Sequence, residues 1–220
     1  MRGIRTNHLA IYGCLLFFAT AAHARASTVG PQSTAPWSQT RAFAPGQQVH
    51  LEINVGDLRI LASPDEHQLR LVIQPKRAIS SEELKSWVPQ FDVKGSQANI
   101  RLHMPKHGNQ SGTVTLYVPT STALNIDLDV GDMTIEGISG DKNLSVDVGD
   151  LKVGGLVPSE YGIVKNSTGI GDVEDRAFSA KQSGWLGKSE KVVGSGKYHI
   201  RCHVGIGDIR MQKGSAVGTD

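Results

Sequence analysis

The stretch Tyr198–Val204 holds two histidines, an arginine and a cysteine, which are the residue types of a zinc site or a Cys-His nucleophile. Its residues alternate between polar and apolar, which predicts a strand with His199, Arg201 and His203 on one face. Along a strand the two histidines lie roughly 13 Å apart, too far to share one zinc ion with bonds of about 2.1 Å. Cys202 falls on the opposite face. We therefore predict a small core residue there and no catalytic or metal site.

Five of the Gly-Asp pairs in the sequence each stand between two short apolar stretches. Glycine permits the positive φ of a sharp corner, and an aspartate carboxylate can accept hydrogen bonds from the backbone amides that follow it. We therefore predict that these pairs are structural turns. They are Gly56-Asp57, Gly131-Asp132, Gly149-Asp150, Gly171-Asp172 and Gly207-Asp208.

A cation site is the alternative for the same residues. If neighbouring repeats stack as strands about 4.8 Å apart, Asp132, Asp150 and Asp172 form a ladder of carboxylates. Hard cations usually take several oxygens from one short loop, and no loop of this sequence offers them. We therefore predict no metal and no cofactor. Further carboxylates on the same strands could join the ladder: Asp127, Asp129 and Asp147.

Other chemical motifs are weak. Gly169–Asp172 and Gly205–Asp208 are rich in glycine, but no helix or P-loop Lys-Ser/Thr follows them, so a phosphate cradle is disfavoured. The sequence holds no Gly-x-Ser-x-Gly, His-Glu-x-x-His or Cys-x-x-Cys motif, and we predict a protein that is not an enzyme. Four aromatic residues could still offer a surface for stacking sugars: Trp87, Trp185, Tyr161 and Tyr198.

The elements that carry these residues repeat. The segments 125–137 and 143–155 share Asn, Asp and Val-Gly-Asp in register, so that the second segment reads as a copy of the first. Units too small to bury a core alone indicate stacked rungs. The interval from Asp172 to Asp208 is twice that from Asp132 to Asp150, so the segment 176–196 could be a degenerate rung around Glu190 or a long loop. Since the interval from Asp57 to Asp132 is not a multiple of this repeat, we assign the first Gly-Asp to a less regular N-terminal portion.

Period-2 alternation predicts further strands over 48–55, 58–60, 69–73, 99–103 and 113–118. One short helix is expected, because Ser80 and Glu83 form a capping-box pattern and Pro89 limits its length. We predict that the apolar side of the repeats lines the interior. These positions are Ile126, Leu128, Val130, Leu144, Val146 and Val148.

The N-terminus predicts export. Arg2 and Arg5 precede an apolar run over 9–22, and small residues allow cleavage after Ala24 or Ala26. The run is short for a membrane span, so we expect no transmembrane segment after cleavage. Residues 25–46 are expected to be a flexible lead-in, 47–212 the domain and 213–220 a disordered tail.

Composition narrows the classes of partner. The chain has 25 glycines, 5% aromatic residues, 23 Lys+Arg and 21 Asp+Glu, and loss of two N-terminal arginines leaves the remainder neutral. A nucleic-acid binder would show a clustered basic face in the sequence, so no nucleic-acid partner is expected. Cys202 is the only cysteine beyond the apolar run, so no intramolecular disulfide is expected.

The run Leu116–Pro119, the segment Leu124–Asp132 and the Gly-Asp units that follow resemble the bacterial "putative adhesin" domain, a DUF4097-type family. The resemblance spans residues 47–212. It implies an all-β, single-domain β-solenoid, or β-helix-like stack, that is secreted or associated with the cell envelope. It implies no catalytic residues.

Together these observations predict a non-enzymatic, exported protein of the periplasm, cell surface or extracellular space that binds an envelope protein, a glycan or itself. The alternative is a carbohydrate-active enzyme or glycan-binding protein on a β-helix. The binding surface is expected on polar residues of the strands: Asp127, Asp129, Thr134, Ser145, Asp147 and Lys152.

Overall fold

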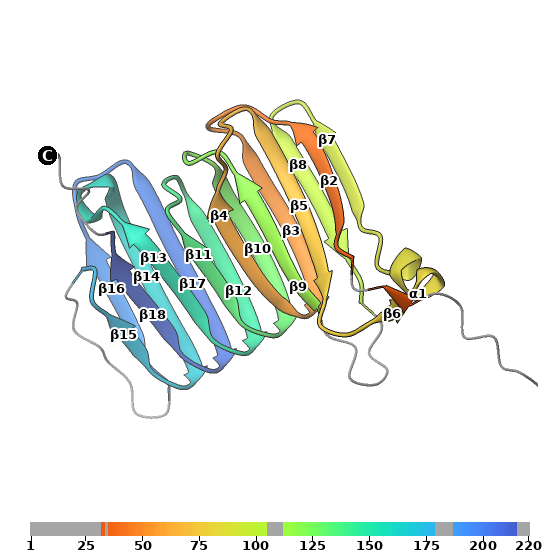
Figure 1. The fold of residues 1–220 in the computed structure, drawn as a ribbon. Helices are drawn as coiled ribbons and strands as arrows, with labels where there is room; N and C mark the ends of the chain where they lie inside the picture. The colour runs from red at the N-terminus through yellow and green to blue at the C-terminus, as the bar shows by residue number, and fades with distance from the viewer. Residues whose placement is uncertain (1–31, 34, 105–111, 179–186, 215–220) are drawn as a thin grey trace, which may run out of the picture.

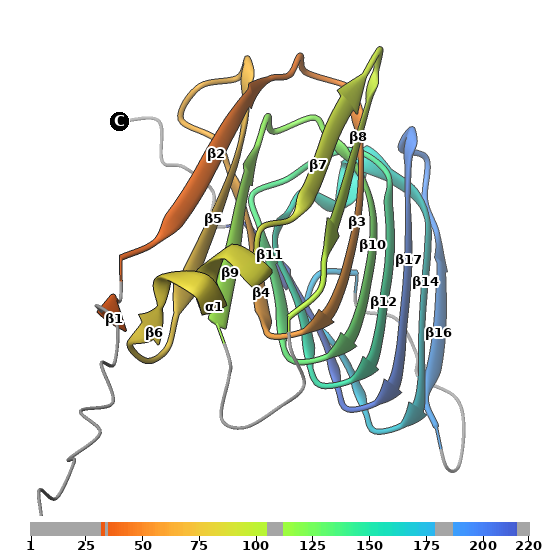
Figure 2. The same ribbon diagram turned by 90° about the vertical axis from the view of Figure 1, so that its right-hand side faces the viewer.

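The computed structural model describes residues 32–33, 35–104, 112–178 and 187–214. Two eight-stranded sheets lie face to face, with a helix of six residues at one end (Figures 1 and 2). In order across the sheet, sheet I contains β16 (Ser189–Val193), β14 (Tyr161–Ile170), β17 (Tyr198–Ile206), β12 (Lys142–Val148), β10 (Ala123–Val130), β3 (Gln48–Val55), β8 (Gln97–Leu102) and β7 (Gln90–Lys94). Sheet II contains β15 (Val173–Asp175), β18 (Ile209–Lys213), β13 (Leu151–Leu156), β11 (Met133–Glu136), β4 (Asp57–Ala62), β9 (Gly112–Val118), β5 (Gln68–Pro75) and β2 (Trp37–Ala42).

Six units, each a strand of sheet I followed by a strand of sheet II, build the stack. Neighbouring units pair in parallel in both sheets. Their spatial order is β8/β9, β3/β4, β10/β11, β12/β13, β17/β18 and β14/β15. The chain therefore does not wind consecutively, because the last two units at each end have exchanged places relative to the sequence.

The first Gly-Asp belongs to this regular stack. Val55 pairs with Val130 and Leu58 with Met133, which brings Gly56-Asp57 alongside Gly131-Asp132. The prediction that Asp57 lies in a less regular portion is therefore wrong. The long interval between Asp57 and Asp132 arises because β5, β7, β8 and β9 are inserted between the two units.

Antiparallel strands close both ends of the stack. β7 pairs with β8, β5 with β9 and β2 with β5 at one end, and β16 pairs with β14 at the other. Glu190 thus lies on a returning edge strand, which replaces the degenerate rung or loop expected for 176–196. β2 also forms within the predicted lead-in, where Trp37 packs against the core.

The core lies between the sheets and follows the predicted alternation except at the corners. Ile126 and Val146 are fully buried, but Val130 and Val148 are 46% and 43% exposed, so their predicted interior position is wrong. Each is the last residue before a glycine with positive φ, where the backbone turns away from the strand direction. The aliphatic residues Val130, Val148, Ile206 and Ile170 consequently form an exposed row along the stack.

The predicted helix is α1 (Ser81–Ser86), and Ser80 caps it by accepting a 3.1 Å hydrogen bond from the amide of Glu83. The Glu83 carboxylate pairs with Arg77 at 2.8 Å, so only the hydroxyl half of the predicted capping box forms. A short pairing of β1 (Gln32–Ser33) with β6 (Ile79–Ser80) precedes it. At the other terminus, the predicted tail begins inside β18, which ends at Lys213.

Several predictions concern residues outside the described ranges. These are the signal peptide, Trp185 and residues 215–220 of the tail.

Candidate functional site

The Gly-Asp pairs form a continuous row of corners between the two sheets. The five glycines have φ between +131° and +140°. An added Cβ on Gly149 would lie 2.0 Å from the carbonyl oxygen of Gly131, and one on Gly207 would lie 2.1 Å from that of Gly149. Each corner therefore rests directly on the backbone of its neighbour, which leaves no room for a side chain.

The corner aspartates are tied to one another through the backbone. Asp132 Oδ1 accepts the amide of Asp150 at 3.0 Å, Asp150 Oδ1 accepts that of Asp208 at 2.9 Å, and Asp208 Oδ1 accepts that of Asp172 at 2.9 Å. The order is therefore Asp132, Asp150, Asp208, Asp172, which differs from the consecutive ladder considered from the sequence. The turn hydrogen bonds cross between units, whereas the sequence suggested bonds to the amides that follow each aspartate.

Arg210 neutralises the middle of this row. Its guanidinium pairs with Asp150 Oδ2 and Asp208 Oδ2, each at 3.0 Å. The Asp208 amide, followed by Arg210, lowers the pKa of Asp150 below its usual value. Across the part of the chain that the structure describes, no group of three or more His, Cys, Asp or Glu residues is arranged to hold a metal ion.

The stretch 198–204 has the geometry expected of a strand. His199, Arg201 and His203 are exposed on the outer face of β17, and Cys202 is 1% exposed between the sheets. Burial raises the pKa of the Cys202 thiol to about 12, so the thiolate is scarce at neutral pH. Asp141 pairs with His199 Nδ1 at 3.4 Å and accepts its backbone amide at 2.7 Å.

The outer face of sheet I brings together polar residues that are distant in the sequence. Lys191, Lys165 and Arg201 occupy matching positions on β16, β14 and β17. Asn143, Asn125 and His50 continue the same row over β12, β10 and β3. We name this set of six the central row.

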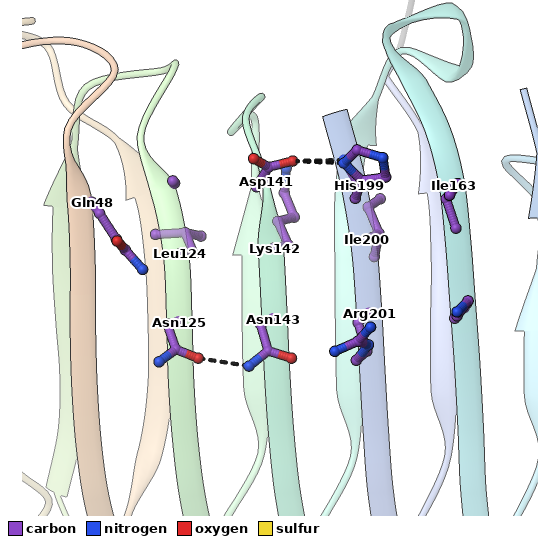
Figure 3. Close-up of a pocket in the computed structure, with 12 residues that line it drawn as sticks. Gln48, Leu124, Asn125, Asp141, Lys142, Asn143, Ile163, His199, Ile200 and Arg201 are labelled. Atoms are coloured by element: carbon purple, nitrogen blue, oxygen red, sulfur yellow. Dashed lines mark hydrogen bonds and ion pairs between the residues drawn. The ribbon is translucent and has the colours of Figure 1, made fainter. Parts of the chain in front are cut away.

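The two halves of the central row differ in their hydrogen bonding. Asn143 Nδ2 donates to Asn125 Oδ1 at 2.7 Å (Figure 3). Asn125 Nδ2 in turn lies 2.8 Å from His50 Nδ1. By contrast, the three cations are exposed on neighbouring strands. At the strand spacing of about 4.8 Å, two adjacent positive charges repel by roughly 1 kcal/mol in water and roughly 3 kcal/mol at an effective dielectric constant of 20.

A second row of side chains runs beside the central row. Its residues are hydroxyls and an imidazole next to the three cations and carboxylates over β10 and β3. Ser167 Oγ lies 3.0 Å from His203 Nδ1 at the basic end. Glu52 lies further along the row, where a hydrogen bond from His50 at 2.8 Å lowers its pKa, and it is paired with Arg101 Nε on β8 at 2.8 Å. Burial raises the pKa of Asp127, and the carboxylates around it act in the same direction. The face therefore has a basic part over β16, β14 and β17 and an acidic part over β10 and β3.

A shallow groove follows this face. It has a volume of about 570 Å³ and is lined by residues that include Asn125, Asn143, Lys165 and Arg201 (Figure 3). A second hollow of about 700 Å³ adjoins it and shares Lys165 and Arg201. These two cations therefore lie where both hollows meet.

The binding surface predicted from the sequence is divided between the two sheets. Asp127, Asp129, Ser145 and Asp147 lie on β10 and β12, which belong to sheet I. Thr134 and Lys152 lie on β11 and β13 of sheet II, so they cannot share one contact surface with the others.

The aromatic residues considered for stacking sugars are mostly unavailable. Trp87 and Tyr161 are 1% and 2% exposed. Tyr198 packs against Tyr161 with ring centroids 6.2 Å apart. A sugar on the outer face of sheet I would therefore meet amides, hydroxyls and cations there.

Two ionisable side chains are buried that the sequence analysis did not place in the core. Lys142 is 2% exposed, donates to Tyr161 Oη at 2.7 Å and to the Gly140 carbonyl at 3.0 Å, and burial lowers its pKa to about 8. Glu190 is 4% exposed, accepts from Asn166 at 3.3 Å, and burial together with nearby Asp175 raises its pKa to about 7. The signal for both was a charged residue at an inward position of an alternating strand.

No helix within the described ranges is long and apolar enough to cross a membrane.

Comparison with known proteins indicates the fold. No family model matches the chain, and no curated protein matches it. A putative cell adhesion protein from Clostridium sporogenes has a similar solved structure, with 16% identity, a TM-score of 0.51 and coverage of 81% of this chain and 100% of that one. A putative adhesin from Bacteroides fragilis has 14% identity, a TM-score of 0.37 and coverage of 81% and 98%. A putative lipid binding protein from Parabacteroides distasonis has 11% identity, a TM-score of 0.27 and coverage of 84% and 96%. The first of these shows that the chain shares its all-β architecture with a solved protein.

Proposed function

We propose that this chain is a non-enzymatic interaction protein of the cell envelope, and that it binds through the outer face of sheet I. The observation that carries the proposal is the central row, in which polar side chains from six strands stand in register and four of them, Asn125, Asn143, Lys165 and Arg201, line one open groove. A stack held by backbone ladders presents such a row rigidly, so little order has to be gained on binding. The name of the Clostridium sporogenes protein, a putative cell adhesion protein, is in line with this role.

The wider assignment belongs to the same proposal. We propose that the six units form a β-solenoid of the adhesin type, in which the two outer units at each end are exchanged relative to their order in the sequence. We propose that the N-terminal sequence is a cleaved export signal ending at residue 24 or 26, and that the domain lies in the periplasm or on the cell surface. In this proposal the Gly-Asp residues are structural corners of the scaffold and not part of its binding site.

A matched pair of variants tests the binding face. Asn143→Trp places a bulky side chain in the groove on β12, and Lys152→Trp places the same side chain on the outer face of β13 in sheet II. Binding of the fluorescently labelled protein to isolated envelope material is measured by sedimentation. We expect Asn143→Trp to abolish most of the binding and Lys152→Trp to retain it.

The proposal is wrong if the wild-type protein does not bind envelope material, or if both variants bind as well as the wild type. The enzymatic alternative is tested in the same samples. New reducing or unsaturated ends in envelope polysaccharides after incubation would replace the interaction role with a carbohydrate-active one.

A further inference from the structure

We propose that the basic part of the sheet I face binds an acidic polysaccharide, whose anionic groups contact Lys165, Lys191 and Arg201. This inference rests on the proposed function, because it assumes that the outer face of sheet I is the binding surface. It adds the chemical class of the ligand and the residues that select it.

The three cations are close together on neighbouring strands of sheet I. Lys165 is in register with Lys191 on one side and with Arg201 on the other. Within the described ranges none of the three forms an ion pair, whereas Arg210 on sheet II is paired with Asp150 and Asp208. Exposed cations that repel one another and have no carboxylate to satisfy them are suited to an anion from outside.

Nearby carboxylates are already engaged or face away. Asp141 accepts the amide of His199 and pairs with its ring. Glu190 belongs to the same edge strand as Lys191, but its side chain is buried between the sheets and accepts from Asn166. The positive potential over β14, β16 and β17 therefore remains largely available to a ligand.

The groups around the cations match a sugar chain better than a simple ion. Asn143 continues the central row beyond Arg201, and its amide is oriented by the hydrogen bond to Asn125. Ser167 and His203 offer a hydroxyl and an imidazole beside the cations. The basic positions repeat across the strands at about 4.8 Å, which is comparable to the length of one pyranose unit. A linear chain with charges and hydroxyls can thus lie across the strands along the groove.

An anionic lipid surface fits this arrangement less well. The exposed aliphatic residues that could enter a bilayer, such as Ile170 and Ile206, lie at the corners. The carboxylate of Asp172 is exposed at the same corner, two residues after Ile170, whereas that of Asp208 is paired with Arg210. An anionic membrane that contacted the aliphatic row would therefore meet like charge.

The test compares charged and neutral forms of the same polymers. Oligogalacturonate and its methyl ester form one pair, and dextran sulfate and dextran form the other. We measure the dissociation constant of the purified mature protein by isothermal titration calorimetry at low and physiological salt. We expect at least one charged polymer to bind, its neutral counterpart to bind about tenfold more weakly or not at all, and salt to weaken the binding.

Two double variants locate the site. Lys165→Gln with Arg201→Gln should weaken binding of the charged polymer by about tenfold or more. Arg59→Gln with Lys152→Gln removes two exposed cations from sheet II and serves as the matched control, which should bind like the wild type. Lys165→Arg keeps the charge and should retain affinity. Because Lys165 and Arg201 are exposed, their replacement should leave the melting temperature unchanged or raise it.

Several results would overturn the proposal. These are failure of both charged polymers to bind, equal binding of neutral and charged forms, or equal losses in the two double variants. Tight binding to phosphatidylglycerol vesicles without binding to either charged polymer would assign the site to lipid, and inorganic phosphate that binds as well as the polymers would assign it to a small anion. If envelope binding still depends on Asn143 in any of these cases, the proposed function survives and only the ligand class is wrong.

Discussion

Replacement of Gly149 by alanine tests the stacking of the corners, and Gly46 provides the matched control. Both glycines have positive φ, +140° at Gly149 and +77° at Gly46. An added Cβ at Gly46 meets nothing within 4 Å, whereas at Gly149 it lies 2.0 Å from the carbonyl oxygen of Gly131. Gly46→Ala therefore loses only what the backbone conformation costs, about 1 kcal/mol.

The cost at Gly149 includes separation of neighbouring units. Ordinary contact begins at 3.4 Å and the added Cβ has only 2.0 Å, so the two corners must move apart by the difference. That movement weakens the hydrogen bonds that join these two units, from Gly131 N to Val148 O at 2.9 Å and from Met133 N to Asp150 O at 2.8 Å. At about 1 kcal/mol for each bond, plus lost packing and the conformational penalty, we expect Gly149→Ala to cost about 4 kcal/mol.

Urea unfolding followed by far-ultraviolet circular dichroism measures the free energy of unfolding of both variants. A difference of about 3 kcal/mol between them is expected, with similar dependence on urea concentration. If the two variants differ by less than about 1 kcal/mol, the corners do not rest on one another as rigidly as this packing requires.

Three further predictions concern charged groups. Because the pKa of Glu190 is raised to about 7, its protonated form stabilises the fold fully below pH 4.5, and this contribution is lost as the pH rises through about 7. Urea unfolding between pH 4.5 and 8 should show that Glu190→Gln removes about 2 kcal/mol of this pH dependence, after allowance for solvent screening. An unchanged pH dependence would contradict the prediction. Because burial lowers the pKa of Lys142 to about 8, the fold gains stability as the pH rises from about 8 towards 10.5. Lys142→Met should flatten this rise in the free energy of unfolding and leave its value at pH 7 equal or higher. A loss of several kcal/mol at pH 7 would show that the hydrogen bond to Tyr161 outweighs the cost of burial. Because the corner carboxylates accept hydrogen bonds from backbone amides and from Arg210, neither calcium nor EDTA should change the melting temperature. A saturable rise in melting temperature with calcium would instead support the cation site.

The strands and corners were largely predictable from the sequence because they depend on local chemistry. Alternation placed β3, β5 and β9 within two residues of their observed ends, and glycine marked the turns. Val130 was misplaced because alternation holds only while the strand stays straight, and the corner glycine ends that condition. β2 was missed because its residues alternate poorly and pair only as an antiparallel edge.

The order of the units could not be predicted, because the units are nearly interchangeable as neighbours. Five of the six units offer the same aliphatic ladder and the same Gly-Asp corner, so β12 would pair about as well with β14 as with β17. The basic part of the face depends on this order. Lys165 is distant from both Lys191 and Arg201 in the sequence, and only the placement of β16 and β17 on either side of β14 unites them.

The position of Arg201 separates two roles of these cations. β16 is the edge of sheet I, and lysines on an edge strand discourage pairing with another chain, so Lys191 alone has a structural explanation. Arg201 lies on β17, the third strand from that edge, where both sides of the strand are already paired. Protection of the edge gives no reason for a cation there beside Lys165, whereas an anionic ligand along the groove does. Substitution of Lys191 alone should therefore favour self-association, and substitution of Arg201 alone should weaken binding of the charged polymer without changing the oligomeric state.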